Sequence, residues 1–452
     1  MFSQGNGTCV FSCKATFLTE RRRLSLESDQ RVGKNKAKGY KQPGRDFVCP
    51  PALDAQLTHH WRDMQDGFND PEELNNVLEF QSDELLWTAQ KQGLWSLEYK
   101  RELTSPLCIA AAQGYSECLQ YLLEHGAHPN LIAGGKAALH EACENANTEC
   151  VELLLEHGAN PNQMTEEGLT PLHLCRTPPS IRCAKALVRQ GAKVNLPSED
   201  EDETPLHVAA RHGLPQHAKL YLRFGAYVNH VSSSGETPLG VLCGVAPEKT
   251  ANSQYDQYLE LCHLLLANWA NINLADKERR SPLHKAARNV QHKLVELLLD
   301  HGADINAIDY NGCSPLSNVL QSCVVRQEWE PHTIVRTLLN RGSIKVWPKA
   351  LLKVLTACAG APKTVEILFN SYALVPVTYR WIKAIPEDIF HLHRPFYESL
   401  FALEYKPRSL EHLCRSELRK YFGKNCWSLI PRLPVPNALQ QYLLLEPEGY
   451  ID

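Results

Sequence analysis

The chain has 452 residues and a formal net charge of −4, from 47 Lys and Arg against 51 Asp and Glu. This small charge argues against a protein held on nucleic acid by overall charge. No apolar run approaches the roughly 18 residues that a membrane-spanning helix needs. Many of the 16 cysteines lie at apolar positions, where free cysteine behaves as a small hydrophobe, and no secretory leader is recognisable after Met1. We therefore expect a reduced, soluble, intracellular protein.

Residues 1–50 are basic, with ten Lys or Arg against four Asp or Glu, and we expect this segment to be disordered. The clusters Arg21–Arg23 and Lys34–Lys38 could direct the protein to the nucleus or bind an acidic partner. Short basic runs are more often simply solvated, and that interpretation is favoured here.

Residues 51–103 are predicted to form a helical N-terminal cap. Pro71–Phe80 has apolar residues at helical spacing with acids in its first turn, and Trp87, Trp95 and Leu97 follow. A stacked array needs such a cover, because its terminal unit cannot leave an apolar face bare.

One phrase recurs along residues 104–345, and it is clearest at Thr204-Pro205-Leu206-His207. A threonine can cap a helix, proline fits the first helical position, and Gly213 suits the left-handed residue that ends the helix. The phrase opens at Ser105, Ala137, Thr170, Thr204, Thr237, Ser281 and Ser314, which gives steps of 32, 33, 34, 33, 44 and 33 residues. Each copy therefore predicts two helices followed by an extended loop.

This period and opening resemble the ankyrin repeat. The resemblance implies a mainly α fold, an ankyrin-repeat solenoid of about seven repeats plus degenerate caps. Residues 346–405 are expected to add a degenerate repeat and connecting helices, since Trp347–Leu352 and Val365–Phe369 suggest one more helix pair. The long step predicts 11 extra residues (44 minus 33) around Val245–Tyr258, which we expect to loop out.

The loops between repeats carry charge. Leu196–Glu203 is acidic, and Asp276–Arg280 is mixed and mostly basic. Such charged fingers suit a surface that recognises a partner protein, but exposed loops are also polar simply because they face water. The sequence leaves these two interpretations evenly weighted.

The last segment, residues 406–452, differs from the repeats. After Ser409, a natural helix cap, apolar residues fall on one helical face, whereas Arg415, Arg419 and Lys420 are expected to stay in water. The apolar positions are Leu410, Leu413, Cys414 and Leu418. The last repeats could cover this apolar face, in which case the tail would be only a cap.

The letters Ser-Leu-x-x-Leu-Cys-Arg from Ser409, followed by Leu-Pro-Val-Pro-x-x-Leu-x-x-Tyr-Leu from Leu433, resemble a three-helix SOCS box. Together with the repeats they resemble the ankyrin-repeat and SOCS-box family. The resemblance implies that Leu410, Leu413, Cys414 and Leu418 bind elongin C, itself held by elongin B. It also implies that Leu433, Pro434, Val435 and Pro436 recruit cullin 5 with its RING partner, although the family often has leucine at the position of Val435.

No catalytic or cofactor-binding arrangement stands out. Neither a Gly-x-Ser-x-Gly elbow, nor a phosphate-binding glycine loop, nor a His-Glu-x-x-His helix occurs. The histidines of the repeat phrase are interpreted as structural, and His391 and His393 lack further ligands at metal spacing. We expect no cofactor and no metal.

The resemblance therefore implies a non-catalytic substrate-recognition subunit of a cullin 5 ubiquitin ligase. Its protein substrate is unknown, and no nucleic acid or membrane partner is expected. The expected location is the cytoplasm, with the nucleus as a further site. The alternative is an ankyrin scaffold that acts without a ligase.

Overall fold

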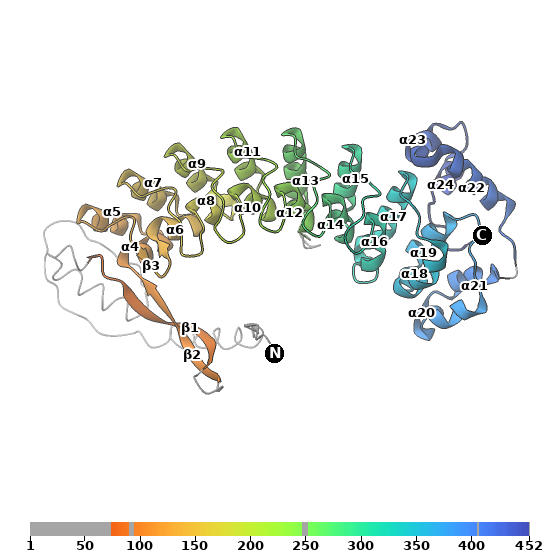
Figure 1. Cartoon of the computed structure of the whole chain (residues 1–452), viewed down its shortest axis with the longest axis horizontal. Coiled ribbons are helices and arrows are strands. Elements are labelled where there is room, and N and C mark those ends of the chain that lie inside the picture. The colour runs from red at the N-terminus through yellow and green to blue at the C-terminus, as the bar shows by residue number, and fades with distance from the viewer. Residues whose placement is uncertain (1–73, 90–94, 246–251, 405, 452) are drawn as a thin grey trace, which may run out of the picture. The chain divides into compact units, whose positions relative to one another are not determined.

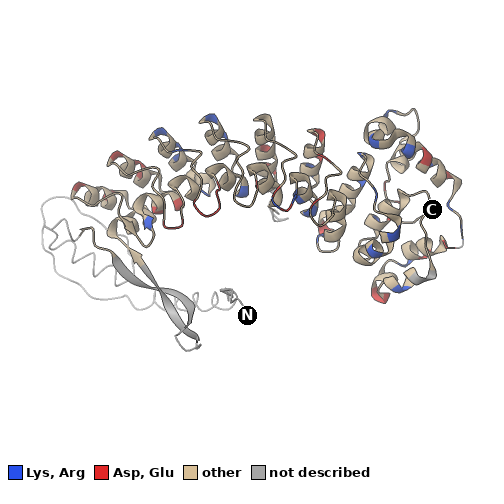
Figure 2. Ribbon diagram, viewed as in Figure 1, with Lys and Arg blue, Asp and Glu red and all other residues tan. Residues whose placement is uncertain are grey.

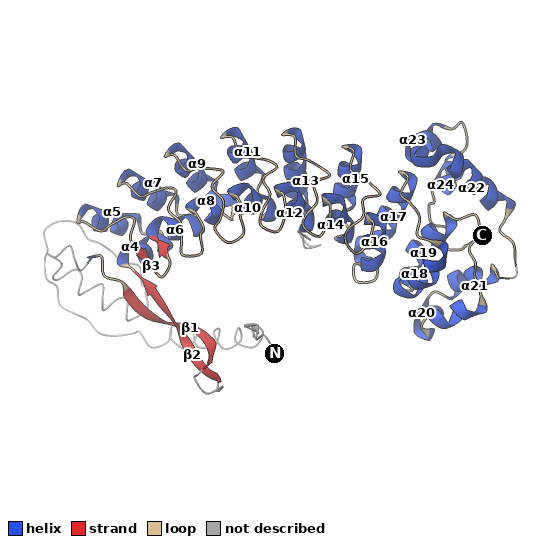
Figure 3. Cartoon of the chain, viewed as in Figure 1, coloured by secondary structure: helices blue, strands red, loops and turns tan. Residues whose placement is uncertain are grey.

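The computed structural model describes residues 74–89, 95–245, 252–404 and 406–451 (Figure 1). These residues are mostly helical, with one longer pair of strands near residue 90 (Figure 3). The segment 1–50, for which the sequence predicts disorder, lies outside the described residues.

A helix pair follows each of the predicted openings. The pairs are α4 (Pro106–Gln113) and α5 (Ser116–Glu124), α6 (Ala138–Glu144) and α7 (Thr148–Glu156), α8 (Pro171–Leu174) and α9 (Ile181–Arg189), α10 (Pro205–Arg211) and α11 (Pro215–Arg223), α12 (Pro238–Gly244) and α13 (Asn252–Ala267), α14 (Pro282–Arg288) and α15 (His292–Asp300), and α16 (Pro315–Ser322) and α17 (Pro331–Asn340). One more pair follows them, α18 (Leu351–Cys358) and α19 (Pro362–Asn370).

Each helix packs on its counterpart in the next pair. The first helices contact one another in the order α4, α6, α8, α10, α12, α14, α16 and α18, and the second helices do so from α5 to α19 (Figure 1). Their facing side chains form one continuous apolar core, which includes many of the cysteines. Each pair therefore buries its faces on its neighbours, as a solenoid requires.

The histidine of the opening phrase joins one repeat to the next. Nδ1 of His173 accepts a hydrogen bond from the amide of Thr170 (3.2 Å), and its Nε2–H donates to the carbonyl of Glu203 in the following loop (2.8 Å). The same arrangement occurs at His140, His207 and His284. Burial lowers the pKa of His173 to about 4, so the ring is neutral as these bonds require. The structural interpretation of these histidines is supported.

Asparagines in the loops form a second ladder between repeats. The side-chain amide of Asn195 donates to the carbonyl of Gly225 (2.8 Å), and its oxygen accepts from the amide of Tyr227 (2.8 Å). Asn130, Asn162, Asn229 and Asn306 bond to their following repeats in the same way. These bonds satisfy loop backbone groups that have no partner in a helix.

The prediction of a helical cap over residues 51–103 is wrong where that segment is described. Residues 78–89 and 95–104 form two antiparallel strands, β1 (Leu78–Ala89) and β2 (Trp95–Thr104), with a register shift between Gln81 and Leu85. The first half of the second strand alternates, with Trp95, Leu97 and Tyr99 separated by polar residues. A period of two suits a strand, and it outweighs the helical spacing that precedes it. A short pair, β3 (Ile132–Ala133) and β4 (Lys136–Ala137), lies in a repeat loop.

The long repeat also differs from its prediction. Part of the inserted stretch extends α13, which has 16 residues, instead of looping out. The hydroxyl of Tyr258 in this extension donates to the carbonyl of Arg211 (2.9 Å), and its ring lies against Gly213. The insertion therefore strengthens the contact with the preceding repeat.

Several shorter elements complete the described chain. They are the 3₁₀ turns η1 (Pro178–Ser180), η2 (Gln327–Trp329), η3 (Pro348–Ala350) and η4 (Tyr379–Ala384), and the helices α20 (Glu387–Leu392) and α21 (Arg394–Ala402). Phe396, Tyr397 and Leu400 of α21 are buried in the core that the repeats share. None of the helices in the described ranges is both long and apolar enough to cross a membrane.

Candidate functional site

The C-terminal module begins with the amphipathic helix α22 (Leu410–Phe422). It continues through η5 (Gly423–Asn425), α23 (Cys426–Leu429), η6 (Ile430–Arg432) and α24 (Asn437–Leu443). Ser409 caps α22 by accepting a hydrogen bond from the amide of His412 (3.1 Å). Cys426, Ile430 and Leu443 form a small core of the module's own.

The polar face of α22 packs against the end of the repeat array. His412, Arg415 and Arg419 follow one another at spacings of three and four residues, so they share one helical face, and all are buried. Nε2–H of His412 donates to the carbonyl of Tyr372 (2.8 Å), and a guanidinium N–H of Arg415 donates to Nδ1 of His412 (2.8 Å). The guanidinium of Arg415 also lies 4.0 Å from the ring centre of Tyr442. This face therefore joins the module to the segment after α19.

Arg419 reaches the last regular repeat. It donates to the side chain of Asn340 at the end of α17 (2.6 Å) and to the carbonyl of Leu443 (2.7 Å). Burial lowers the pKa of Arg419 to about 10, so the guanidinium stays protonated at neutral pH. The prediction that Arg415 and Arg419 stay in water is wrong. Arg419 donates to the side chain of Asn340 and the carbonyl of Leu339 in the repeats, and Arg415 is held by His412 and the ring of Tyr442 within the module. Arg415 and Arg419 are only 2% and 9% exposed.

The opposite face of α22 is left uncovered. Leu410 is 77% exposed, and Leu413, Cys414 and Leu418 are exposed beside it. Tyr421, one turn further on, extends this apolar stripe to the end of the helix. The idea that the last repeats cover the apolar face is therefore wrong. The structure brings the four predicted residues together on one surface, which no other part of the described ranges covers.

The second predicted group lies in the turn between η6 and α24. Pro434 and Pro436 are exposed, whereas Leu433 packs partly against the core of the module. The side-chain amide of Gln440 donates to the carbonyls of Leu433 (3.0 Å) and Val435 (3.3 Å). This amide holds the turn in one conformation, so the prolines are presented on a rigid edge.

Residues 446–451 form a further contact between the C-terminal module and the repeats, which no sequence motif indicated. The amides of Glu448 and Gly449 donate to the carboxylate of Glu366 on α19, and Ile451 is buried with its amide 3.0 Å from Oγ of Ser399. Burial raises the pKa of the Glu366 carboxyl to about 7. The segment 446–451 therefore ties the C-terminal module to α19 and α21.

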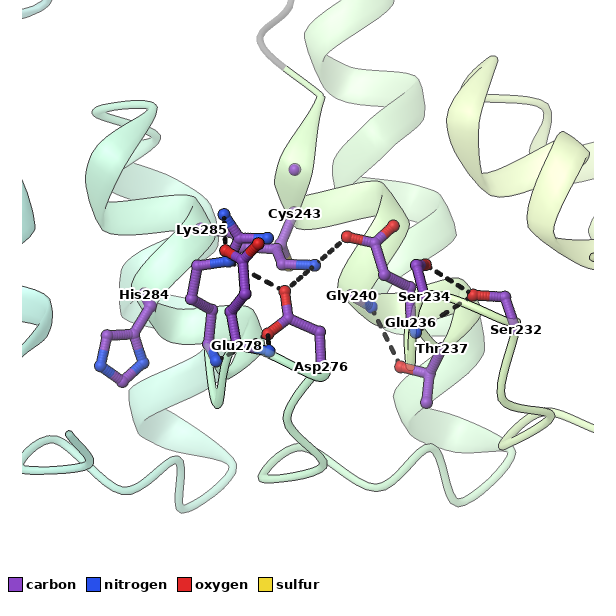
Figure 4. Close-up of polar contacts among 12 residues, drawn as sticks. Ser232, Ser234, Glu236, Thr237, Gly240, Cys243, Asp276, Glu278, His284 and Lys285 are labelled. Atoms are coloured by element: carbon purple, nitrogen blue, oxygen red, sulfur yellow. Dashed lines mark hydrogen bonds and ion pairs between the residues drawn. The ribbon is translucent and has the colours of Figure 1, made fainter. Parts of the chain in front are cut away.

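Some of the charged residues in the loop Asp276–Arg280 belong to a network of ion pairs inside the repeats (Figure 4). The ammonium of Lys285 on α14 pairs with the carboxylates of Glu236 and Asp276 (3.2 Å to the latter), and Asp276 also accepts from Nε of Arg280 (2.9 Å). The phrase has Gly240 where other repeats have histidine, and a Cβ there would lie 3.9 Å from the ammonium nitrogen. Lys285 thus occupies space that a histidine ring would fill. The charges of Asp276 and Arg280 in this loop therefore stabilise the fold.

Replacing Lys285 by Met is expected to lower the free energy of unfolding by about 3 kcal/mol, because two carboxylates would face each other without their cation. Urea unfolding followed by circular dichroism measures this loss. Lys293→Met is the matched control, since Lys293 pairs with Asp256 at 3.9 Å in an exposed position. It should cost less than about 1 kcal/mol. Equal losses in both variants would show that the Lys285 network contributes nothing special.

No metal centre is found in the part of the chain that the structure describes, where no three His, Cys, Asp or Glu side chains come together as ligands. His391 and His393 lie at the end of α20, and only the first of them is within that helix.

Comparison with known proteins agrees with both halves of this description. The family described as ankyrin repeats (3 copies) matches residues 84–165, 107–198, 158–232 and 251–350, and the SOCS box family matches residues 406–444. Human ankyrin repeat and SOCS box protein 18 is 48% identical over 398 residues, which cover 87% of this chain and 84% of that protein. The chain belongs to the ankyrin repeat and SOCS box family.

Two further human relatives lie in the same family. Ankyrin repeat and SOCS box protein 16 is 38% identical and covers 95% of this chain and 97% of its own length. Ankyrin repeat and SOCS box protein 10 is 43% identical, over 79% of this chain and 77% of its own length. Membership, together with the SOCS box, supports a substrate-receptor role in a cullin–RING ubiquitin ligase, as an adaptor that binds proteins.

Proposed function

We propose that this protein is the substrate receptor of an elongin B/C–cullin 5–RING ubiquitin ligase. In this proposal the apolar stripe of α22 binds elongin C, which is held by elongin B, and the turn Leu433–Pro436 contacts cullin 5 with its RING partner. The ankyrin repeats hold the protein substrate. One observation carries the proposal: α22 buries its arginines on the repeats and leaves Leu410, Leu413, Cys414 and Leu418 exposed.

An amphipathic helix ordinarily buries its apolar stripe and leaves its charges in water. The reverse orientation of α22 exposes apolar area that costs free energy until a partner covers it. A helix that lays anchors at spacings of three and four into an apolar groove is a common mode of protein recognition. Leu410, in the first turn and more exposed than Leu413 and Leu418, is the best placed to enter a pocket of the partner.

The receptor needs no chemistry of its own in this proposal. It would hold a substrate lysine close to the charged ubiquitin carrier, and the gain comes from effective concentration and orientation. Cys414 lies on the apolar stripe, so we assign it to packing against elongin C and not to carrying ubiquitin.

The test is co-expression of the full chain with elongin B, elongin C and cullin 5, followed by affinity capture through this chain. We expect wild type to retain all three. A variant with Leu433, Pro434 and Pro436 changed to Ala should keep the elongins and lose at least about tenfold in cullin 5 capture, because a few central contacts carry most of the binding energy of an interface.

Wild type that captures neither elongins nor cullin 5 would overturn the proposal in favour of a scaffold that acts without a ligase. Loss of the elongins in the triple variant would contradict the division of the two sites. The full chain should remain folded in the triple variant, since Pro434 and Pro436 are exposed and Leu433 is only partly buried; circular dichroism of that variant checks this.

A further inference from the structure

The fourth and fifth repeats have aromatic side chains at the junction between the second helix and the loop that follows it, where the fold does not require them. They are Phe224 and Tyr227 after α11, and Trp269 after α13. All three are exposed, with Trp269 the most exposed at 88%. Solvent-exposed aromatic residues that cluster in this way mark binding surfaces more often than they serve folding.

Phe224 gives up a hydrogen bond that other repeats make. At the equivalent position His125 bonds through Nδ1 to the carbonyl of Tyr121 (2.8 Å), and His157 and His301 do the same in their own repeats at 2.9 Å. Such a bond satisfies one of the free carbonyls at the end of a helix. A phenylalanine cannot donate it, so the repeat exchanges a capping bond for an exposed ring.

Trp269 carries a cost in backbone conformation. It has φ of +66° at the position where the other repeats place Gly126, Gly158, Gly191, Gly225, Gly302 and Gly342, all with positive φ. Left-handed backbone is unfavourable for a residue with a bulky side chain, and it is tolerated chiefly by glycine. A Cβ added at Gly225 would meet no atom within 4 Å, so a side chain at this position points into open space. Strain of this kind tends to be retained at functional sites.

These residues are neighbours through the asparagine ladder. The amide of Tyr227 is bonded to Asn195, and the carbonyl of Trp269 accepts from Asn229 (3.1 Å). Beside them, a cleft of about 400 Å³ lies between the third and fourth repeats, lined by Val188, Ala192, Val194, Leu196 and Phe224 with Lys193 and Asn195. The exposed rings and this cleft form a surface that we name the aromatic edge.

The charges at the aromatic edge are positive. The helices end in Arg189 and Arg223 here, whereas the same position is Glu124, Glu156 and Asp300 in the first, second and sixth repeats. Figure 2 shows this change of sign, with blue upper ends on α9 and α11 and red upper ends on α5, α7 and α15. Lys193 adds a third exposed cation beside the cleft.

We propose that the aromatic edge is the substrate-docking surface of this receptor, and that it binds an acidic segment of a partner protein which carries bulky apolar anchors. The anchors enter the cleft beside Phe224 and pack on Trp269 and Tyr227, while Arg189, Lys193 and Arg223 pair with flanking carboxylates. The assignment of this partner as substrate rests on the proposed function, but the binding itself does not.

The test uses a phage-displayed library of random peptides selected on the full chain, followed by affinity measurements with the enriched peptides as synthetic probes. We expect the enriched sequences to combine Asp or Glu with aromatic or large aliphatic residues. Phe224→His and Trp269→Gly each restore the residue that other repeats use, so both variants should fold at least as stably as wild type. Each should weaken binding of the enriched peptides at least about tenfold.

Matched controls distinguish specific binding at the aromatic edge from non-specific binding to exposed aromatic or basic residues. Trp347→Ala removes an equally conspicuous exposed tryptophan elsewhere and should not change peptide affinity, and Arg223→Glu should weaken binding where Lys349→Glu does not. The proposal would be overturned if no peptides were enriched, or if the enriched peptides were basic or lacked apolar residues. It would also be overturned if binding survived Trp269→Gly but was lost in Glu201→Lys, a variant of the acidic loop Leu196–Glu203.

Elongin capture by the same variants keeps the two proposals apart. If Trp269→Gly loses peptide binding and retains elongins B and C, the docking surface stands as a site separate from the SOCS box. If wild type binds the acidic peptides and fails to capture elongins, the proposed ligase role fails while the aromatic edge remains.

Discussion

Leu410→Asp is expected to abolish capture of elongins B and C, with at least a hundredfold loss of affinity. The substitution places a carboxylate where the proposed interface is apolar and dry, and an unpaired buried charge costs at least about 3 kcal/mol, which corresponds to that factor. Affinity capture and titration calorimetry with purified elongin B/C would measure the loss. The fold should be unaffected, since Leu410 is 77% exposed and an acid in the first turn suits the helix dipole.

The matched control is Leu392→Asp, at the end of α20. Leu392 is 74% exposed, like Leu410, but lies outside the SOCS box. It should capture elongins as wild type does, with a free energy of unfolding within about 0.5 kcal/mol of wild type. Undiminished elongin binding in Leu410→Asp would move the anchor to another residue of the stripe.

Acidification below pH 6.5 is expected to destabilise the folded chain. Burial lowers the pKa of His173, His207, His217 and His412 to about 4, from an ordinary value of 6.5. Below pH 6.5 these histidines therefore bind protons in the unfolded chain, whereas in the folded chain they stay neutral until the pH approaches 4. Their stabilising contribution is full above pH 6.5 and is lost as the pH falls toward 4, and it amounts to about 3 kcal/mol per histidine at most.

Glu366 acts in the opposite direction. Its raised pKa, about 7, means that the folded chain gains protons here before the unfolded chain does, so this group favours folding as the pH falls from 7 toward 4.5. One carboxyl offsets only part of the effect of four histidines. Urea unfolding at pH 7, 5.5 and 4.5 should therefore show a fall of several kcal/mol in the free energy of unfolding.

His207→Gln provides the control for the pH effect. It should be less stable than wild type at pH 7, because a carboxamide does not reproduce the bonds of the ring to Thr204 and Glu236, which are 3.1 Å each. Its stability should also decline less steeply with acid, since one titrating group is gone. A wild-type unfolding free energy that stays constant from pH 7 to 4.5 would contradict the assignment of neutral, buried histidines.

The repeats could be predicted from the sequence because their signals are local and periodic. A threonine or serine cap, the following proline, and a glycine at the helix end each act within a few residues, and their recurrence defines the array. The SOCS box was recognisable for a similar reason, since its letters are contiguous. The prediction of a helical cap failed at residues 78–89 and 95–104. There the alternation in β2 competed with the helical spacing of apolar residues, and the pairing of β2 with β1 decided the outcome.

Sequence alone thus determined the helix pairs, the order of the two parts and the four residues of the apolar stripe. Only the tertiary structure decided which face of α22 is free, because that depends on what the neighbouring surface offers. The end of the array presents the carbonyl of Leu339 and the amide oxygen of Asn340, which suit the multiply donating side chain of Arg419, and the carbonyl of Tyr372 accepts from His412. The leucines find no such complement there, and their stripe stays exposed for a partner.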